Sequence, residues 1–465
     1  MNMINVRRLT VMTFLGAGML SGISAQVSPL QVDTLKETKI PDQWDLQSCI
    51  DYAKEQNITI RKNRITAAST QIDVKTAKAA LFPSLSFSTG HQVVNRPYQE
   101  TSSRVSGSEI ISSNSKTSYN GNYGLNASWT LYNGNKRLKT IQQEKLNNQM
   151  AELDVATSEN NIQESITQVY IQILYAAESV KVNENTLQVS IAQRDRGQEL
   201  LNAGSIAKSD LAQLEAQVST DRYQLVTAQA TLEDYKLQLK QLLELDGENE
   251  MNIYLPALSD ENVLAPLPTK RDVYISALSF RPEIEASKLN VEASELGINI
   301  AKSSYFPTIS LSAGIGTNHT SGSDFTFGEQ VKNGWNNSIG LSVSVPIFNN
   351  RQTKSAVQKA KLQYETSMLS LLDEQKALYK TIESLWLDAN SAQQRYAAAN
   401  EKLKSTQISY ELISEQFNLG MKNTVELLTE KNNLLQAQQE QLQAKYMAIL
   451  NTQLLKFYQG DQLAI

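Results

Sequence analysis

The chain contains one long unit twice, and this duplication restricts its possible folds more than any other feature. In the second copy, a strand-like alternation at 341–345 is followed by a turn at 346–350 and then by a run without proline or glycine up to Gly420. The residues from Arg351 to Asn418 are therefore predicted to form one continuous helix. At about 1.5 Å per residue such a helix is about 100 Å long, several times the usual length in globular proteins.

The first copy repeats the same order of elements between Leu125 and Gly204. The spacing from Leu131 to Gly204 in this copy equals the spacing from Ile347 to Gly420 in the second. Since no residue has been gained or lost between the strand and the far end of the helix, both copies are predicted to contain a rigid helix of the same length.

The duplication predicts two interlocked repeats rather than the roughly three separate domains that chain length alone suggests. Each repeat is expected to comprise a helix, a β-hairpin, a long helix and a return helix. The first helix is predicted to run from Leu46 to about Ala80, and its counterpart to begin near Asp272. The predicted segments are a signal peptide at 1–25, a first repeat at 26–245 with its hairpin at about 82–132 and its long helix to about 203, a connector at 246–271, a second repeat at 272–460 with its hairpin at about 306–348 and its long helix to about 419, and a tail at 461–465.

The segment 1–25 has the pattern of a cleavable secretory signal. Arg7 and Arg8 precede the mostly apolar stretch 9–22, and small residues end at Ala25. The alternative, a membrane-spanning helix, needs about 20 apolar residues, and this stretch is too short. The mature chain is therefore expected to leave the cytoplasm. The only cysteine, Cys49, lies on an apolar helix face away from the cleavage site, so we predict an inert buried thiol rather than a nucleophile or a lipid attachment point.

Four segments alternate between apolar and small polar residues, at 84–88, 125–131, 309–316 and 341–347. Strands of a soluble sandwich alternate in the same way and are the alternative to a membrane barrel. The secretory signal and the aromatic residues near the strand ends favour the barrel; these are Phe82, Trp129, Tyr132, Phe306 and Phe348. Four strands cannot close a barrel, and an open edge in lipid leaves backbone groups unpaired at several kcal/mol each. The edges are therefore predicted to pair with other copies of the chain.

Apolar residues recur every seven positions along the predicted helices. Examples are Leu371, Leu378 and Leu385 in the second long helix and Ile166 and Ile173 in the first. Sustained heptads predict helices packed side by side as coiled coils. The other faces are rich in Gln, Asn, Ser, Lys and Glu, so each helix is expected to have a narrow apolar seam and a broad hydrated face.

The far ends of the long helices carry a second repeated pattern. Gly204 and Gly420 stand where a helix is expected to end in a left-handed turn. Asp210 and Glu426 occupy equivalent positions after these turns, with Lys422 beside the second. If several copies of the chain converge at this tip, the opposite charges are expected to form ion pairs that hold the end closed.

The sequence contains no phosphate-binding glycine loop and no nucleophile elbow. The two histidines, His91 and His319, lie in or beside the hairpin strands at non-equivalent positions and without metal-ligand spacing, so we interpret them as ordinary polar residues. We therefore predict no enzyme activity, no cofactor and no metal site. The formal net charge of −5, without a basic tract, argues against nucleic acid as a partner.

Taken in order, the motifs resemble the TolC-like outer-membrane efflux proteins. They are a helix ending in Phe82-Pro83 or Phe306-Pro307, two strands, an elbow of Leu-Tyr-Asn-Gly or Pro-Ile-Phe-Asn, a long helix and a glycine-bearing tip. This order occurs twice and covers nearly all of the mature chain. The resemblance implies a membrane α+β fold, internally duplicated, in which four strands per chain contribute to a trimeric, twelve-stranded outer-membrane β-barrel. A long antiparallel α-helical coiled-coil tunnel in the periplasm continues the barrel.

The same resemblance implies an exit duct of a tripartite efflux or type I secretion system, which conducts substrates passively and is gated at its periplasmic tip. The implied partners are further copies of the chain in a homotrimer, a periplasmic adaptor protein, an inner-membrane transporter and outer-membrane lipid. Adaptor docking is assigned to Gly204, Ser205, Ile206, Gly420 and Met421, and the closing constriction to Asp210, Phe417, Lys422 and Glu426. The alternative is a secreted periplasmic coiled-coil scaffold or adaptor without a pore, which explains the heptads and the signal but not the paired hairpins.

Overall fold

The computed structural model describes residues 41–98, 102–106, 109–113, 116–246, 251–256, 263–321, 323 and 325–463 of the chain. The expected signal peptide, most of the segment before Trp44, parts of the connector and the last two residues of the expected tail lie outside these ranges. The described residues from Gln43 onward group into one unit by their contacts.

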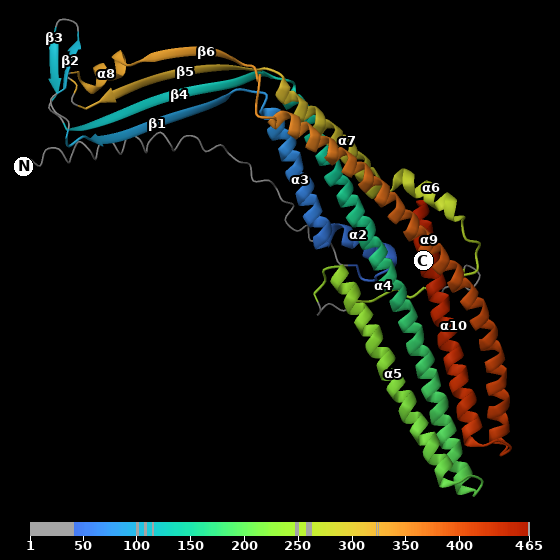
Figure 1. Cartoon of the computed structure of the whole chain (residues 1–465). Helices are drawn as coiled ribbons and strands as arrows, with labels where there is room; N and C mark the ends of the chain where they lie inside the picture. The colour runs from blue at the N-terminus through green and yellow to red at the C-terminus, as the bar shows by residue number, and fades with distance from the viewer. Residues whose placement is uncertain are drawn as a thin grey trace, which may run out of the picture. The chain divides into compact units, whose positions relative to one another are not determined.

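The long strands of the two repeats form one antiparallel sheet in the order β1-β4-β5-β6 (Figure 1). These strands are β1 (Ser84–Asn95), β4 (Thr117–Asn133), β5 (Thr308–Thr320) and β6 (Asn336–Ser344). Because β4 of the first repeat pairs with β5 of the second, backbone hydrogen bonds join the two repeats. β1 and β6 are the edges of this sheet.

The register places apolar side chains on one face of the sheet and small polar ones on the other, as the alternation predicted. One row of neighbours runs Leu85, Ala127, Ala313, Ile339, and the row beside it runs Ser86, Asn126, Gly314, Ser338. The connections between the paired strands contain further regular structure. Strand β4 already begins at Thr117, and the loop regions contain the strand pair β2 (Ser102–Ser106) and β3 (Glu109–Ser113) and the helix α8 (Phe327–Asn333).

The elbow from sheet to long helix has the same backbone geometry in both repeats. Gly134 and Asn135 have φ of 66° and 62°, and their equivalents in the second repeat, Asn350 and Arg351, have φ of 52° and 65°. At Gly134 a Cβ atom would lie 2.6 Å from the carbonyl oxygen of Ser303, so only glycine fits this close approach.

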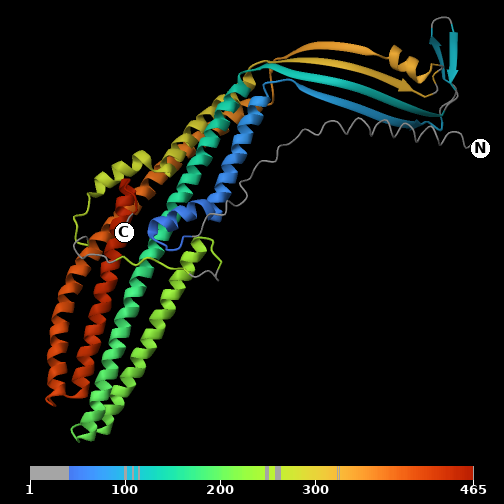
Figure 2. The ribbon, with the colours of Figure 1, turned by 180° about the vertical axis from the view of Figure 1, so that it is seen from behind.

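The two long helices, α4 (Lys136–Asn202) and α9 (Gln352–Asn418), each contain 67 residues, which confirms the prediction of one uninterrupted helix up to Asn418. Their return helices are α5 (Lys208–Leu242) and α10 (Thr424–Gln459). Figure 2 shows α4 beside α5 and α9 beside α10, and α10 also packs against α4. In the part of the chain that the structure describes, no helix is both long enough and apolar enough to cross a bilayer.

The prediction of one helix from Leu46 to about Ala80 is wrong, because the helix breaks at Asn57 into α2 (Leu46–Gln56) and α3 (Ile58–Ala79). The Asn57 side chain accepts hydrogen bonds from the first turn of α3, and its Nδ2 donates to the carbonyl of Leu242 at 3.0 Å. The second repeat breaks at the equivalent Arg281, between α6 (Lys270–Phe280) and α7 (Pro282–Lys302). There the proline at the first helical position starts the new helix.

The largest apolar core lies among α2, α4, α5 and α10. Trp44, Cys49, Ile166, Tyr170 and Leu239 are all buried in it. Backbone hydrogen bonds from Trp44 to Asn252 and from Tyr254 to Trp44, both 2.8 Å, attach the connector to the start of the first repeat. Cys49 is buried, as predicted, and burial raises the pKa of its thiol to about 12.

Candidate functional site

The two helical tips have the same hydrogen-bonded turn. Gly204 and Gly420 have φ of 75° and 76°, the left-handed conformation that was predicted. The N–H groups of Gly204 and Ser205 donate to the carbonyls of Leu201 and Leu200 at 2.9 and 2.8 Å, and those of Gly420 and Met421 donate to Phe417 and Gln416 at the same two distances. This pair of bonds satisfies carbonyls that a helix end otherwise leaves without a partner.

The residues expected to dock an adaptor lie together on these turns. A Cβ atom at Gly204 or Gly420 would have no described heavy atom within 4 Å, so both turns face open space. Met421 is 73% exposed, Ser205 is exposed and Ile206 is half-buried. The Arg196 guanidinium of α4 donates to the carbonyl of Asn418 on α9 at 3.5 Å, which joins the two tips.

The charged residues expected at the constriction lie at the starts of the return helices. Lys422 Nζ and Glu426 Oε1 are 2.6 Å apart, so the structure brings this pair together within one chain. The hydrogen bonds from Lys422 and from the Asn423 N–H hold the pKa of Glu426 below its ordinary value. At the other tip, the Asp210 carboxylate accepts from the Ala207 N–H at 3.0 Å, in the equivalent N-terminal position.

Phe417, the fourth residue expected at the constriction, is buried within the chain. It is 2% exposed and packs with Leu214 of α5 and Leu427 of α10. Its ring therefore contributes to a small apolar core that holds the tip together. Thr429, one turn into α10, donates its hydroxyl hydrogen bond to the carbonyl of Val425 at 2.8 Å.

A buried polar cluster near the tips was missed by the sequence analysis. Lys431 of α10 donates to the carboxylate of Asp221 on α5 and to the hydroxyl of Ser190 on α4, and Ser190 in turn donates to Asp221. All three residues are at most 3% exposed. Burial lowers the pKa of Lys431. The cluster ties both helical hairpins together, because α4 and α5 belong to the first repeat and α10 to the second.

The signal that identifies this cluster is a charge at an apolar seam position. Along α5 the buried positions Leu211, Leu214 and Val218 lead to Asp221 at alternating steps of three and four residues. Along α10 a step of the same kind leads from Leu427 to Lys431. A charge in such a seam is costly unless an opposite charge meets it from a neighbouring helix.

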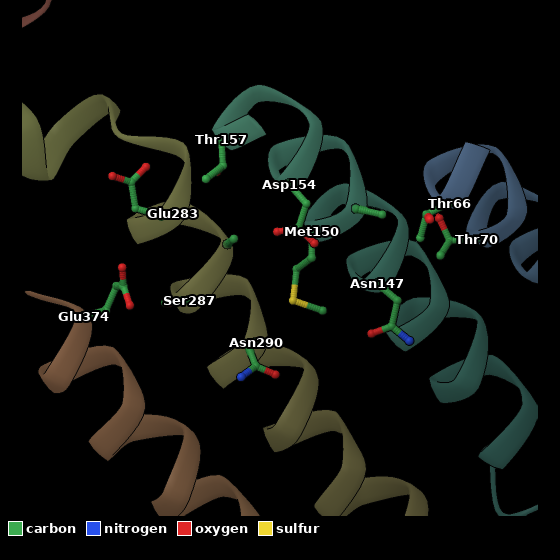
Figure 3. Close-up of a pocket in the computed structure, with 12 residues that line it drawn as sticks. Thr66, Thr70, Asn147, Met150, Asp154, Thr157, Glu283, Ser287, Asn290 and Glu374 are labelled. Atoms are coloured by element: carbon green, nitrogen blue, oxygen red, sulfur yellow. The ribbon is translucent and has the colours of Figure 1, made fainter. Parts of the chain in front are cut away.

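A polar groove of about 520 Å³ lies among α3, α4, α7 and α9 (Figure 3). Three carboxylates line it, from Asp154, Glu283 and Glu374, and no Lys or Arg of the described residues does. The other labelled lining residues are mainly hydroxyl and amide side chains. Such a lining suits water and hydrophilic solutes better than an apolar ligand.

Comparison with known proteins identifies the family of this chain. The sequence model of the family described as outer membrane efflux protein matches residues 49–244 and 273–460. The chain is 24% identical over 299 residues to the outer membrane efflux protein BepC of Brucella suis, covering 64% of this chain and 62% of BepC. It is 24% identical over 291 residues to the outer membrane protein TolC of Escherichia coli K12, covering 61% of this chain and 58% of TolC. These alignments thus span about six-tenths of each relative.

Solved structures show the same fold over nearly the whole chain. A crystal structure of CusC, which forms a transmembrane channel, superposes with a TM-score of 0.75 at 18% identity, covering 90% of this chain and 92% of CusC. This likeness concerns the fold alone. The resemblance deduced from the repeated motifs is confirmed by the family match to both repeats: the chain belongs to the outer membrane efflux protein family.

Proposed function

We propose that the chain forms the outer-membrane exit duct of a tripartite efflux or type I secretion system. The observation that carries this proposal is an open sheet with one exposed apolar face. Ile339, Phe87 and Leu341 on this face are 84%, 68% and 65% exposed. An apolar surface of this kind is costly in water but stable against lipid acyl chains. A water-soluble scaffold would leave the same face hydrated.

Closing the sheet requires further copies of the chain. The free edges are β1 and β6, so β1 of one copy pairs with β6 of the next. Two copies would give eight strands, and side chains fill the interior of a barrel of that size. Three copies give twelve strands and leave room for a water-filled lumen. A homotrimer with a twelve-stranded barrel is therefore the smallest closed assembly that can conduct.

The polar side of the sheet supports passive conduction. Neighbouring rows of this face consist of Ser, Asn, Gln and Gly, and Ser84 and Ser128 hydrogen-bond across two strands at 2.8 Å. These small side chains leave space and offer no deep binding site. The carboxylate-lined groove among α3, α4, α7 and α9 adds a hydrated surface on the helices. Cargo selection then belongs to an inner-membrane transporter rather than to this duct.

The helical tips are the proposed gate and adaptor site. The exposed turns at Gly204–Ile206 and at Gly420 and Met421 present backbone and the apolar side chain of Met421 to a periplasmic adaptor. The charges of Asp210, Lys422 and Glu426 lie beside these turns, and three copies would bring three sets together. Splaying of the tips on adaptor binding opens the duct.

Cysteine cross-linking between β1 and β6 tests the assembly. In a Cys49→Ala background, Phe87→Cys is combined in turn with Ile339→Cys, Leu341→Cys or Val343→Cys, which samples the possible registers between copies. We expect at least one combination to give covalent dimers and trimers on oxidation in membranes. The control pair Ala127→Cys and Ala313→Cys joins strands of one chain and should give monomers. Monomers in all combinations, with the mature chain soluble without detergent, would support the scaffold instead.

Charge reversal tests the gate. Lys422→Glu replaces the attraction to Glu426 by repulsion, and we expect a higher resting conductance of the trimer in planar bilayers. Lys404→Glu is the matched control, because its exposed pair with Glu401 at 2.8 Å lies within α9, away from the turn. Equal conductance of the two variants would remove Lys422 from the gate while leaving the duct intact.

A further inference from the structure

The only two histidines of the chain flank the same glycine on three neighbouring strands. His91 of β1 lies opposite Gly121 of β4, and Gly121 lies opposite His319 of β5. The sequence separations of these residues concealed this arrangement, which depends on the strand register. The two side chains are on the same face of the sheet as Leu85 and Phe87, at the strand ends beyond them.

Both imidazole rings border the space above Gly121. A Cβ atom at Gly121 would lie 2.6 Å from Nδ1 of His319 and 3.2 Å from Nδ1 of His91, so the two nitrogens are at most about 6 Å apart. A metal ion bound to two imidazoles at about 2.0–2.1 Å each needs nitrogens about 3–4 Å apart. A small side-chain rotation therefore closes the distance, provided that no side chain fills the space above residue 121.

His91 is hydrogen-bonded through both of its ring nitrogens. Tyr119 Oη lies 2.8 Å from His91 Nδ1, and Thr89 Oγ1 lies 3.1 Å from His91 Nε2. When Nε2–H donates to Thr89, the lone pair of Nδ1 accepts from the Tyr119 phenol, and a metal ion at Nδ1 takes the place of this single hydrogen bond. Donation of the second ring N–H to a neighbouring oxygen is usual for a metal-binding histidine.

The His319 Nδ1 atom differs from His91 Nδ1 in its hydrogen bonding. It is buried and has no hydrogen-bond partner among the described residues. A buried polar atom without a partner costs about 1–3 kcal/mol. A cation placed between the two rings would give this nitrogen the partner that the described part of the chain does not supply.

Aromatic rings pack against both imidazoles. Tyr123 stacks on His319 with ring planes at 16° and centroids 6.1 Å apart, and Phe327 of α8 meets His319 edge-on at 4.9 Å. Tyr119 stacks on His91 with ring planes at 7°. Rings held in this way lose little freedom on binding a ligand, which favours binding.

We propose that His91 and His319 bind one divalent transition-metal ion per chain through their Nδ1 atoms, with water completing the coordination. Imidazole suits Zn²⁺, Cu²⁺ and Ni²⁺, whereas Ca²⁺ and Mg²⁺ require oxygen ligands. Among the described residues no group of three or more His, Cys, Asp or Glu side chains forms a metal site, so this is an open, two-histidine site of modest affinity. The ion joins β1 to β5, and hence the first repeat to the second, whatever the duct transports.

The test is calorimetric titration of the full mature protein, stripped with a chelator, with Zn²⁺ or Ni²⁺ alone. We expect one ion per chain, and binding at least tenfold weaker in His91→Gln and His319→Gln. Gly121→Ala retains both histidines but fills the space between them, so it should weaken binding as strongly. Gly124→Ala is the matched control on the same strand, because its Cβ would have no described neighbour closer than 3.5 Å and binding should be unchanged.

Electron paramagnetic resonance of bound Cu²⁺ provides a second readout that does not depend on stability. The unaltered protein should show hyperfine coupling to two nitrogens, and each His→Gln variant to no more than one. Circular dichroism and trimer mobility establish that each variant is folded. The proposal is overturned by absence of binding up to millimolar metal, or by binding that His91→Gln and His319→Gln leave unchanged.

Discussion

Replacement of Lys431 by methionine is the sharpest test of how the helical tips are held. Lys431 is 3% exposed and donates to Asp221, which is 2% exposed. Methionine fills most of the same volume, so the main effect is the loss of the positive charge. The Asp221 carboxylate then retains the amide of Gln217 at 2.9 Å and the hydroxyl of Ser190, but no cation among the described residues.

The expected cost follows from the burial of the pair. Removing one partner of a buried ion pair typically costs about 3–5 kcal/mol, because the other charge stays desolvated. The two remaining hydrogen bonds to Asp221 place the expectation near the lower end, at about 3 kcal/mol. Replacing both charges, as in Lys431→Met with Asp221→Leu, should restore most of this loss, since buried pairs are often replaceable by apolar residues of similar volume.

Hydrogen–deuterium exchange of the protein extracted in mild detergent measures this cost locally. A loss of about 3 kcal/mol should speed exchange of the tip amides of α5 and α10 by about 100-fold. Lys402→Met is the control, because Lys402 pairs with Glu440 at 2.7 Å with both side chains more than 40% exposed, and its removal should cost less than about 1 kcal/mol. Equal exchange in the two single variants, or exchange in the double variant as fast as in Lys431→Met, would contradict a stabilising buried ion pair at the tips.

Three further predictions concern single residues elsewhere in the chain. In Gly420→Ala the alanine must adopt φ of 76°, although its Cβ contacts no described atom. We expect the free energy of local unfolding at the tip, measured by hydrogen exchange, to fall by about 1 kcal/mol. An unchanged free energy would contradict the left-handed turn. Cys49, with a pKa of about 12, should resist thiol reagents at about pH 8 until the protein unfolds, whereas labelling of the native protein would show that the core opens. Burial, the largest influence, raises the pKa of Glu164, so its contribution to stability is present at low pH and lost as the pH rises through the raised value. In Glu164→Gln the melting temperature should therefore fall less as the pH rises above the ordinary glutamate pKa of 4.5, and an unchanged pH profile would exclude this carboxyl as the cause.

Local patterns were sufficient to predict the long helices and the faces of the strands. Because α9 contains no proline or glycine and has an apolar residue at every seventh position, its sequence predicts one long helix. The strict alternation of apolar and polar residues in β5 predicts which side of this strand is apolar. The family resemblance rested on the order of such local motifs. These features depend on residues close together in the sequence, which is why the sequence alone reveals them.

Features that depend on distant contacts were not predictable in the same way. The break at Asn57 is stabilised by its hydrogen bond to Leu242, which is 185 residues away. The Lys431–Asp221 pair connects residues that are 210 positions apart. The approach of the two histidines depends on the strand register, and a shift of one residue in β5 would place His319 on the other face.

The equal length of α4 and α9 has a consequence for engineering this protein. Both helices contain 67 residues and end in the same turn, and their return helices pack against them. Inserting one residue would rotate everything beyond it by about 100° and turn the apolar seam toward water. Inserting seven residues at matching places in all four helices keeps the seam and lengthens each helix by about 10 Å. Redesigned versions that reach across a wider or narrower periplasm are therefore available only in discrete steps of one heptad.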